Sequence, residues 1–247
     1  MQKQTVPKKG WYAWAGGLAL ALFLFLVFPA FEYYFYYLII IIHEFGHMIT
    51  SWLFGYPALV SFDFVYGGGY SPTLNRNTFV LIGVYAVFIF LLYRFRSRKH
   101  INKWIIALVA VYTLVGFSKL HGVIIDFMGH GMELVFATIF LYRGLSGYAV
   151  KIPLERPLYA FCGFYIQFHD IGFAHQLITS AAYRAEYSMS KGGGHVMDFD
   201  RIADQIAGGN VSLVAAIFFI LCLLPPFMAL AYHEYKPRLP NDLRVRP

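Results

Sequence analysis

The sequence predicts an all-α polytopic membrane protein that crosses the bilayer six or seven times, in a single membrane domain covering residues 1–247. One observation is composition: 59% of the residues are hydrophobic and only 13% are charged, whereas soluble domains carry about 25% charged residues. The other is arrangement, because the apolar residues form blocks that reach or approach the roughly 20 residues needed to cross a bilayer. The predicted segments are 11–31, 33–55, 78–93, 104–120, 131–149, 158–183 and 211–232.

Three of these segments have features that refine the prediction. The first follows a basic N-terminus but has no clear small-x-small cleavage site, so we expect a retained helix instead of a signal sequence. The segment at 158–183 is the weakest of the seven, because it contains His169, Asp170 and His175, and ionisable residues in membrane helices line a cavity or the interface. The last segment contains Pro225–Pro226 and should kink there.

Charge and cysteine content argue against two classes of function. The net charge is +7, and most basic residues lie in short segments beside apolar blocks, as membrane topology requires. No stacking-aromatic or groove-binding pattern accompanies them, so we expect no nucleic-acid partner. Cys162 and Cys222 both lie in apolar segments and provide neither a disulfide framework nor a C-x-x-C metal site. By the same topology rule, the basic loop 94–103 is expected on the cytoplasmic side.

Residues 184–210 form the long polar stretch of the chain. This stretch contains three consecutive glycines, followed by His195, Asp198 and Asp200. Polar residues beside glycines are typical of solvated turns. We therefore favour a solvated turn for these three residues over a role in binding metal.

The residues that indicate chemistry lie in the second segment, where 38–54 read LIIIIHEFGHMITSWLF. His43 and His47 are four apart and would share one face of a helix, at a spacing that lets two imidazoles hold one zinc ion. Glu44 stands beside the first histidine, where its carboxylate can accept a proton from a zinc-activated water. An ionisable residue inside a membrane helix costs about 2.5–3.5 kcal/mol, and a divalent cation would offset that cost. The alternative is a polar cluster that hydrogen-bonds to neighbouring helices.

The stretch HEFGHMITSWLFG, followed by an apolar–polar loop that ends in GGGY, resembles the site-2 protease family of intramembrane zinc metalloproteases. The resemblance covers about residues 33–93. It implies that His43 and His47 are zinc ligands, that Glu44 is the general base, and that a glycine-containing hairpin and a further transmembrane helix follow. The third ligand of that family is an aspartate in an N-P-x-D-G-like motif, which this chain lacks.

We look for the third ligand in residues 121–137, HGVIIDFMGHGMELVFA. Asp126, His130 and Glu133 are spaced by four and three, so one helical face could carry all three. Glu133 is the first choice, by analogy with zinc sites of two histidines and one glutamate, followed by His130 and then Asp126. The glycines on either side of His130 could instead interrupt the helix, so that His130 caps its second part. The alternative without a metal is a cluster that caps helices and joins them by hydrogen bonds.

The loop at 56–77 is predicted to form a short hairpin or a re-entrant loop. Its residues alternate between apolar and polar and then reach Gly67, Gly68 and Gly69. Glycines let a backbone approach another chain closely, so these three could bind an extended substrate that adds a strand to the loop. An ordinary turn is the alternative.

These features together predict a zinc metalloendopeptidase that cleaves transmembrane segments of other membrane proteins. The metal core would lie at about 33–150, with C-terminal helices and the polar loop at 151–247. The compact form and short loops favour a bacterial inner (cytoplasmic) membrane. Two alternatives are a protease-like, non-catalytic structural subunit of a larger membrane complex, and a histidine-rich subunit that binds haem or another redox cofactor.

Overall fold

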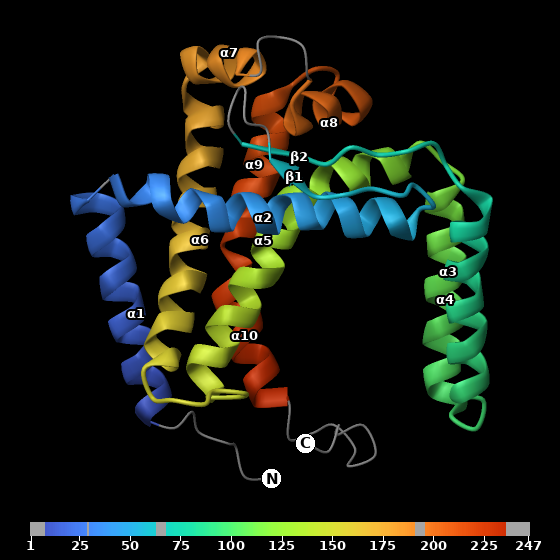
Figure 1. The fold of residues 1–247 in the computed structure, drawn as a ribbon, viewed down its shortest axis with the longest axis horizontal. Coiled ribbons are helices and arrows are strands. Elements are labelled where there is room, and N and C mark those ends of the chain that lie inside the picture. Colours follow the sequence, from blue (N-terminus) through green and yellow to red (C-terminus); the bar gives the residue numbers. More distant parts are fainter. Residues whose placement is uncertain (1–7, 29, 63–67, 191–195, 236–247) are drawn as a thin grey trace. The chain divides into compact units, whose positions relative to one another are not determined.

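The computed structural model describes residues 8–28, 30–62, 68–190 and 196–235. Within these ranges the chain folds almost entirely into helices, with one two-stranded antiparallel sheet (Figure 1). The helices are α1 Lys8–Val27, α2 Ala30–Leu53, α3 Thr78–Arg94, α4 Lys99–Gly116, α5 Leu120–Ser146, α6 Glu155–Thr179, α7 Ala181–Met189, α8 Asp198–Ile206, α9 Val211–Cys222 and α10 Leu224–Tyr235. The strands are β1 Ser61–Phe62 and β2 Gly69–Tyr70.

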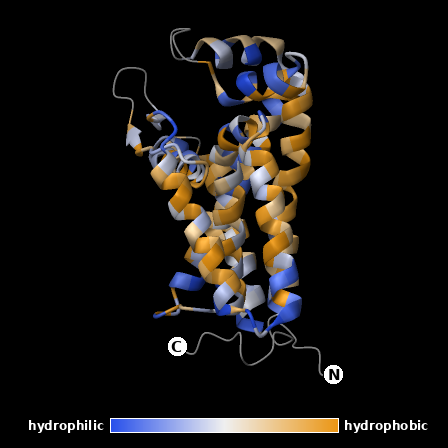
Figure 2. Cartoon of the chain, turned by 90° about the vertical axis from the view of Figure 1, so that its right-hand side faces the viewer, coloured by the Kyte–Doolittle hydropathy of each residue, from blue (hydrophilic) through white to orange (hydrophobic). Residues whose placement is uncertain are grey.

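Three helical segments are long and apolar enough to cross a membrane, among the residues that the structure describes. They are α1, α5 and the segment Val211–Tyr235, which comprises α9 and α10. Figure 2 shows hydrophobic residues along much of the length of the long helices. Large apolar side chains also face outward on other helices, such as Phe79 on α3 at 83% exposed and Leu114 on α4 at 74%. Exposed apolar surface of this kind is typical of sites that contact a membrane or another protein.

Every predicted membrane segment overlaps one or two helices, but the expected number of crossings exceeds the three that length and apolarity support. The segments at 33–55, 78–93, 104–120 and 158–183 correspond to α2, α3, α4 and α6. The described part of α3 is only 17 residues long, and α2 carries the polar residues of the histidine motif. Crossings by these four helices therefore stay predictions.

The predicted kink near the C-terminus is confirmed as a break between α9 and α10 at Leu223. Proline has no amide hydrogen, so Pro226 cannot donate to the carbonyl of Cys222 four residues before it. The side chain of Gln167 on α6 replaces that donor, with its Nε2 2.9 Å from the Cys222 carbonyl oxygen. A buried carbonyl that loses its helical partner is thus satisfied by a neighbouring helix.

The chain divides into two compact units, and each draws on segments that are distant in sequence. The first comprises residues 1–39, 132–185 and 212–247, of which only the described parts are discussed. Its helices pack closely at small residues, as membrane helices do. A β-carbon on Gly17 of α1 would overlap Ala160 of α6, and one on Gly163 of α6 would overlap Leu141 of α5.

The second unit comprises residues 40–131 and 186–211. It contains the C-terminal part of α2, the sheet, α3, α4, the first part of α5, and α8. The predicted hairpin after the second segment is confirmed, because β1 and β2 pair with Ser61 opposite Tyr70 and Phe62 opposite Gly69. Arg76 follows the hairpin and ties it to the end of α2 by a hydrogen bond. Its Nε atom donates to the carbonyl oxygen of Phe54 at 3.1 Å.

Helix α5 is continuous from Leu120 to Ser146. The expected start near residue 131 is therefore too late, and of the two possibilities for Gly129 and Gly131 the structure shows the continuous helix. Glycine costs only about 1 kcal/mol in a helix interior, and packing can outweigh that cost. At Gly129 the packing partners are His43 and His47 of α2.

Candidate metal centre

Helix α2 places His43 and His47 one turn apart with their rings facing each other. The two Nε2 atoms are 3.0 Å apart, and the ring centroids are 4.7 Å apart. The helical spacing predicted this shared face, and the structure confirms it. Both side chains are largely enclosed, with 16% of His43 and 9% of His47 exposed.

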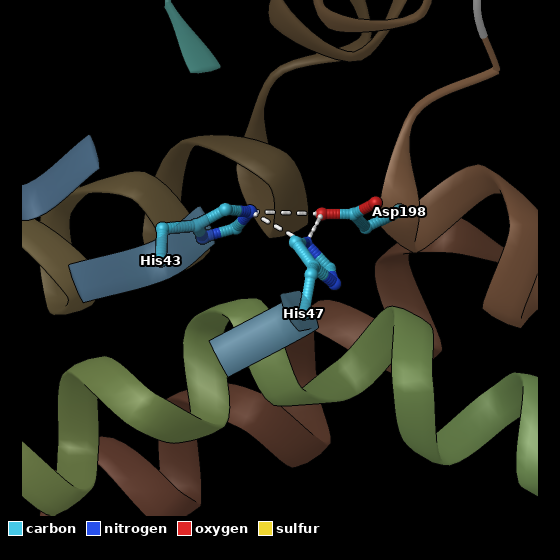
Figure 3. A group of neighbouring side chains, drawn as sticks. All are labelled: His43, His47 and Asp198. Carbon is cyan, nitrogen blue, oxygen red and sulfur yellow. Dashed lines mark hydrogen bonds and ion pairs between the residues drawn. The ribbon is translucent and has the colours of Figure 1, made fainter. Parts of the chain in front are cut away.

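The third member of the group is Asp198, the first residue of α8 (Figure 3). Its Oδ2 atom lies 3.0 Å from Nε2 of His43 and 3.0 Å from Nε2 of His47. Figure 3 shows the carboxylate and the two rings converging on one point from two separate helices. Two imidazole nitrogens and a carboxylate oxygen in this arrangement could hold a metal ion.

The proton on His47 can be placed from its second ring nitrogen. Its Nδ1 atom is 2.8 Å from the carbonyl oxygen of Ile125 on α5, and a carbonyl can only accept a hydrogen bond. The Nδ1 atom therefore carries a hydrogen, which in a neutral ring leaves a lone pair on Nε2. This is the arrangement that metal-bound histidines normally show.

The ligand-type atoms of this group fit a cation, because an unprotonated ring nitrogen and a carboxylate oxygen both carry lone pairs. In neutral His47 the Nε2 atom and Oδ2 of Asp198 are both acceptors at 3.0 Å, and such a pair needs a proton or a cation between its members. The three ligand-type atoms, at mutual separations of 3.0 Å, are close enough together to hold one metal ion between them.

Asp198 is held in its ionised form by the histidines. Burial alone would raise the pKa of its carboxyl, but in the metal-free group, with protons on the histidine rings, charge interactions and hydrogen bonds with His47 and His43 outweigh burial and hold that pKa well below the usual range. A charged carboxylate is the form that binds a metal ion.

The other oxygen of Asp198 is occupied by Arg201, one turn further along α8. The Nη2 atom of Arg201 donates to Oδ1 of Asp198, and its Nε atom is 3.2 Å from Oδ1 of Asp126 on α5. The remaining oxygen of Asp126 accepts a hydrogen bond from Nε2 of Gln205 at 3.2 Å. Asp126, a candidate ligand from the sequence, thus directs both of its oxygens to α8.

Two residues of α5 near the histidines were also singled out from the sequence. A β-carbon on Gly129 would overlap ring atoms of both His43 and His47, so only glycine leaves room for the pair. The ring of His130 lies 4.5 Å from that of His43 and 4.9 Å from that of Phe199, measured between centroids. His130 therefore adjoins the group, with a ring nitrogen within 4.8 Å of one on His43.

Glu133, the first choice for third ligand, belongs to the other compact unit. Its side chain is only 2% exposed, and it interacts with Asp170 of α6, which is 1% exposed. Its assignment as a ligand stays a prediction. In the second unit, Asp198 occupies the position beside the histidines.

Glu44 follows His43 on α2, and its carboxylate lies against the hairpin. It is 6% exposed, and its Oε2 atom accepts a hydrogen bond of 2.6 Å from Oγ of Ser71, which follows β2. A β-carbon on Gly69 would overlap the Glu44 carboxylate. Gly68 has open space around it, and Gly67 lies outside the described residues.

The expected solvated turn at Asp198 is wrong, because this residue begins a helix and its side chain is only 13% exposed. A signal for that helix exists in the sequence. Phe199, Ile202 and Ala203 are spaced as one helical face, and all three are buried. Asp200 accepts a hydrogen bond of 3.0 Å at Oδ1 from Oγ of Ser188. His195 lies outside the described residues.

Comparisons with protein-family models, with curated proteins and with solved structures found no match to this chain. Fold and site therefore define only a class: a helical protein with membrane-type helices and a buried group of histidines and a carboxylate that could hold a metal ion.

Proposed function

We propose that this protein is an intramembrane zinc metalloprotease, a zinc metalloendopeptidase that cleaves transmembrane segments of other membrane proteins. The observation that carries the proposal is the meeting of three ligand-type atoms, on His43, His47 and Asp198, at mutual distances of 3.0 Å. Glu44, the carboxylate that such chemistry requires, lies on the same helix beside the first histidine. Metal-binding residues alone would not suggest hydrolysis, but this combination does.

The residues divide the hydrolysis between them. A zinc ion held by the two histidines and Asp198 would acidify a water molecule and polarise the peptide carbonyl. Glu44 would accept one proton from the water while the oxygen of that water attacks the carbonyl carbon of the peptide. The same carboxyl then delivers that proton to the departing nitrogen as the C–N bond breaks. Ser71 holds one Glu44 oxygen by a hydrogen bond of 2.6 Å, which leaves the other for this proton transfer.

On this proposal the substrate peptide binds along the hairpin. A transmembrane helix has to unwind before its backbone can be cut, and an unwound peptide can pair with a strand edge. Strand β2 contains Gly69, which contacts Glu44, so a peptide along this strand would run past the carboxylate. On this proposal Gly68 and Gly69 contribute backbone to substrate binding.

The proposed setting is a lipid bilayer crossed six or seven times, with a bacterial inner membrane as the proposed location. Its support is the long apolar helices and the outward-facing apolar side chains of α3 and α4. The partners would be membrane proteins that present a substrate segment, or subunits of a membrane complex.

A cleavage assay tests the proposal directly. Purified protein in lipid vesicles is mixed with a panel of single-span peptides, beside Glu44→Gln, and products are detected by mass spectrometry. We expect cleavage by the wild-type protein and its loss, by at least about 100-fold, in the variant, because a general base contributes about 10²–10⁴-fold. Equal cleavage by both proteins would contradict the mechanism. Zinc without any cleavage would favour a structural subunit, and iron or haem would favour a redox subunit.

A further inference from the structure

The guanidinium group of Arg201 contacts two aspartates on different helices. One is Asp198, which faces His43 and His47, and the other is Asp126 on α5. Arg201 of α8 donates a hydrogen bond through Nη2 to Oδ1 of Asp198, and its Nε atom forms an ion pair with Oδ1 of Asp126 on α5 at 3.2 Å. Gln205, also on α8, donates to the other oxygen of Asp126 at 3.2 Å. The three contacts together fix α8 against α5 at the point where Asp198 meets the histidines.

The contact with Arg201 decides which oxygen of Asp198 faces the histidines. An aspartate can bind a cation through one oxygen or through both. Here Oδ1 is bonded to Arg201, and only Oδ2 lies at 3.0 Å from the two ring nitrogens. A guanidinium offers donors in a fixed planar fork, so it can hold two carboxylates at set positions at once. With Oδ1 engaged by Arg201, Asp198 would offer a bound ion one oxygen only.

The same guanidinium keeps a competing carboxylate away. Asp126 is 8% exposed, and its helix also supplies the carbonyl of Ile125 that bonds to His47. A buried carboxylate needs a charged or hydrogen-bonding partner. Arg201 and Gln205 engage both of its oxygens.

We infer that Arg201 is a positioning residue that restricts Asp198 to binding metal through Oδ2 alone, and that Asp126 and Gln205 hold Arg201 in place for this role. The inference rests on the proposed metal site. It adds that the zinc affinity and the coordination number of the site depend on a residue that does not touch the metal.

The test measures metal binding in the purified full-length protein. Zinc affinity is measured by competition with a chromophoric chelator, and coordination is measured from the visible absorption of bound Co²⁺, which is strong for four ligands and weak for more. The variants are Arg201→Gln, which removes the charge, Arg201→Lys, which cannot bond both carboxylates in a planar fork, and Asp126→Asn. Asp204→Asn is the matched control, because Asp204 is an exposed acidic residue one turn from Arg201 on the same helix.

We expect Arg201→Gln to weaken zinc binding by about 10–100-fold, the usual effect of losing a group that orients a ligand. The Co²⁺ absorption should weaken as well, because the freed Oδ1 of Asp198 joins the metal. Arg201→Lys and Asp126→Asn should give smaller changes in the same direction, and Asp204→Asn should match the wild-type protein.

Three results would overturn the inference. One is unchanged zinc affinity in Arg201→Gln and Arg201→Lys. Another is a loss of affinity with unchanged Co²⁺ absorption, which would mean that Arg201 only docks α8. The third is an equal loss in Asp204→Asn, which would mean a general effect of charge. If the wild-type protein binds neither Zn²⁺ nor Co²⁺, it is the proposed metal site that fails, and the inference fails with it.

Discussion

Gly69 of β2 lies directly against the carboxylate of Glu44, so that a β-carbon on Gly69 would overlap the carboxyl group. Two residues later, Ser71 bonds the same carboxylate through its hydroxyl at 2.6 Å and reaches the Glu44 carbonyl oxygen at 3.1 Å. The hairpin therefore confines Glu44 by contact on one side and by a hydrogen bond on the other.

Gly69→Ala should reduce cleavage severely while leaving zinc bound. The added methyl group must displace either the hairpin or the Glu44 carboxylate, and a shift of about 1 Å in a catalytic group can cost about 100-fold in rate. Peptide cleavage and zinc content of the same preparation are the two measurements. Gly83→Ala is the control, because this exposed glycine of α3 has no atom within 4 Å of an added β-carbon. Full activity in Gly69→Ala would contradict the confinement.

Ser71→Ala should lower the rate of cleavage about 10-fold. A hydrogen bond to a charged group contributes about 1.5–3 kcal/mol, and part of that loss would appear in the transition state. Ser71→Thr keeps the hydroxyl and should restore most of the rate. The measurement is kcat and KM for one cleaved peptide, with the change expected in kcat. A change confined to KM would assign Ser71 to substrate binding instead.

Gly129→Ala should weaken zinc binding, because the added methyl group would overlap the rings of His43 and His47. The rings would have to separate, and ligand positions at a zinc site tolerate displacements of only about 0.2 Å. Chelator competition measures the affinity, and circular dichroism checks the helix content. Helical propensity alone predicts the opposite direction for stability, since alanine is favoured over glycine by about 1 kcal/mol in a helix. An unchanged zinc affinity would be evidence against the packing described above.

The zinc-free protein should lose stability in acid through Asp198. The folded pKa of this carboxyl lies well below its usual range, whereas an unfolded aspartate titrates near about 3.9. Its contribution is therefore complete above about pH 4 and is lost as the pH falls through the folded value. Hydrogen exchange in α8, measured at a series of acidic pH values, should show this dependence. Asp198→Asn should show a shallower one, and identical profiles would contradict the assignment.

Much of the fold follows from local sequence patterns. Apolar blocks predicted a helix at each of seven positions, and Pro225–Pro226 predicted the break before α10. The alternating loop with its glycines predicted the hairpin. The four-residue spacing of His43 and His47 predicted their shared face. All of these depend on residues close together in sequence, where helix and strand periodicities apply.

The third member of the metal group could not be found in this way. Asp198 lies 151 residues after His47, and no periodicity connects positions so far apart. The search near residues 121–137 did find Asp126, whose partner is Arg201 beside Asp198. The error came from the three glycines before Asp198, which suggested a turn and concealed the buried face of α8. A short amphipathic helix after a glycine run is therefore worth testing as part of a site.

The central claim, that His43, His47 and Asp198 form a zinc site, is tested most directly by the amount of zinc bound per chain. We would purify three proteins identically and dialyse them against a weak chelator: the wild-type protein, Asp198→Asn and Asp204→Asn. The zinc content of each is then measured by elemental mass spectrometry. The account predicts about one zinc per chain in the wild-type protein and in Asp204→Asn, and little or none in Asp198→Asn, because a neutral amide is a poor zinc ligand. Equal zinc in all three proteins, or none in the wild-type protein, would contradict it.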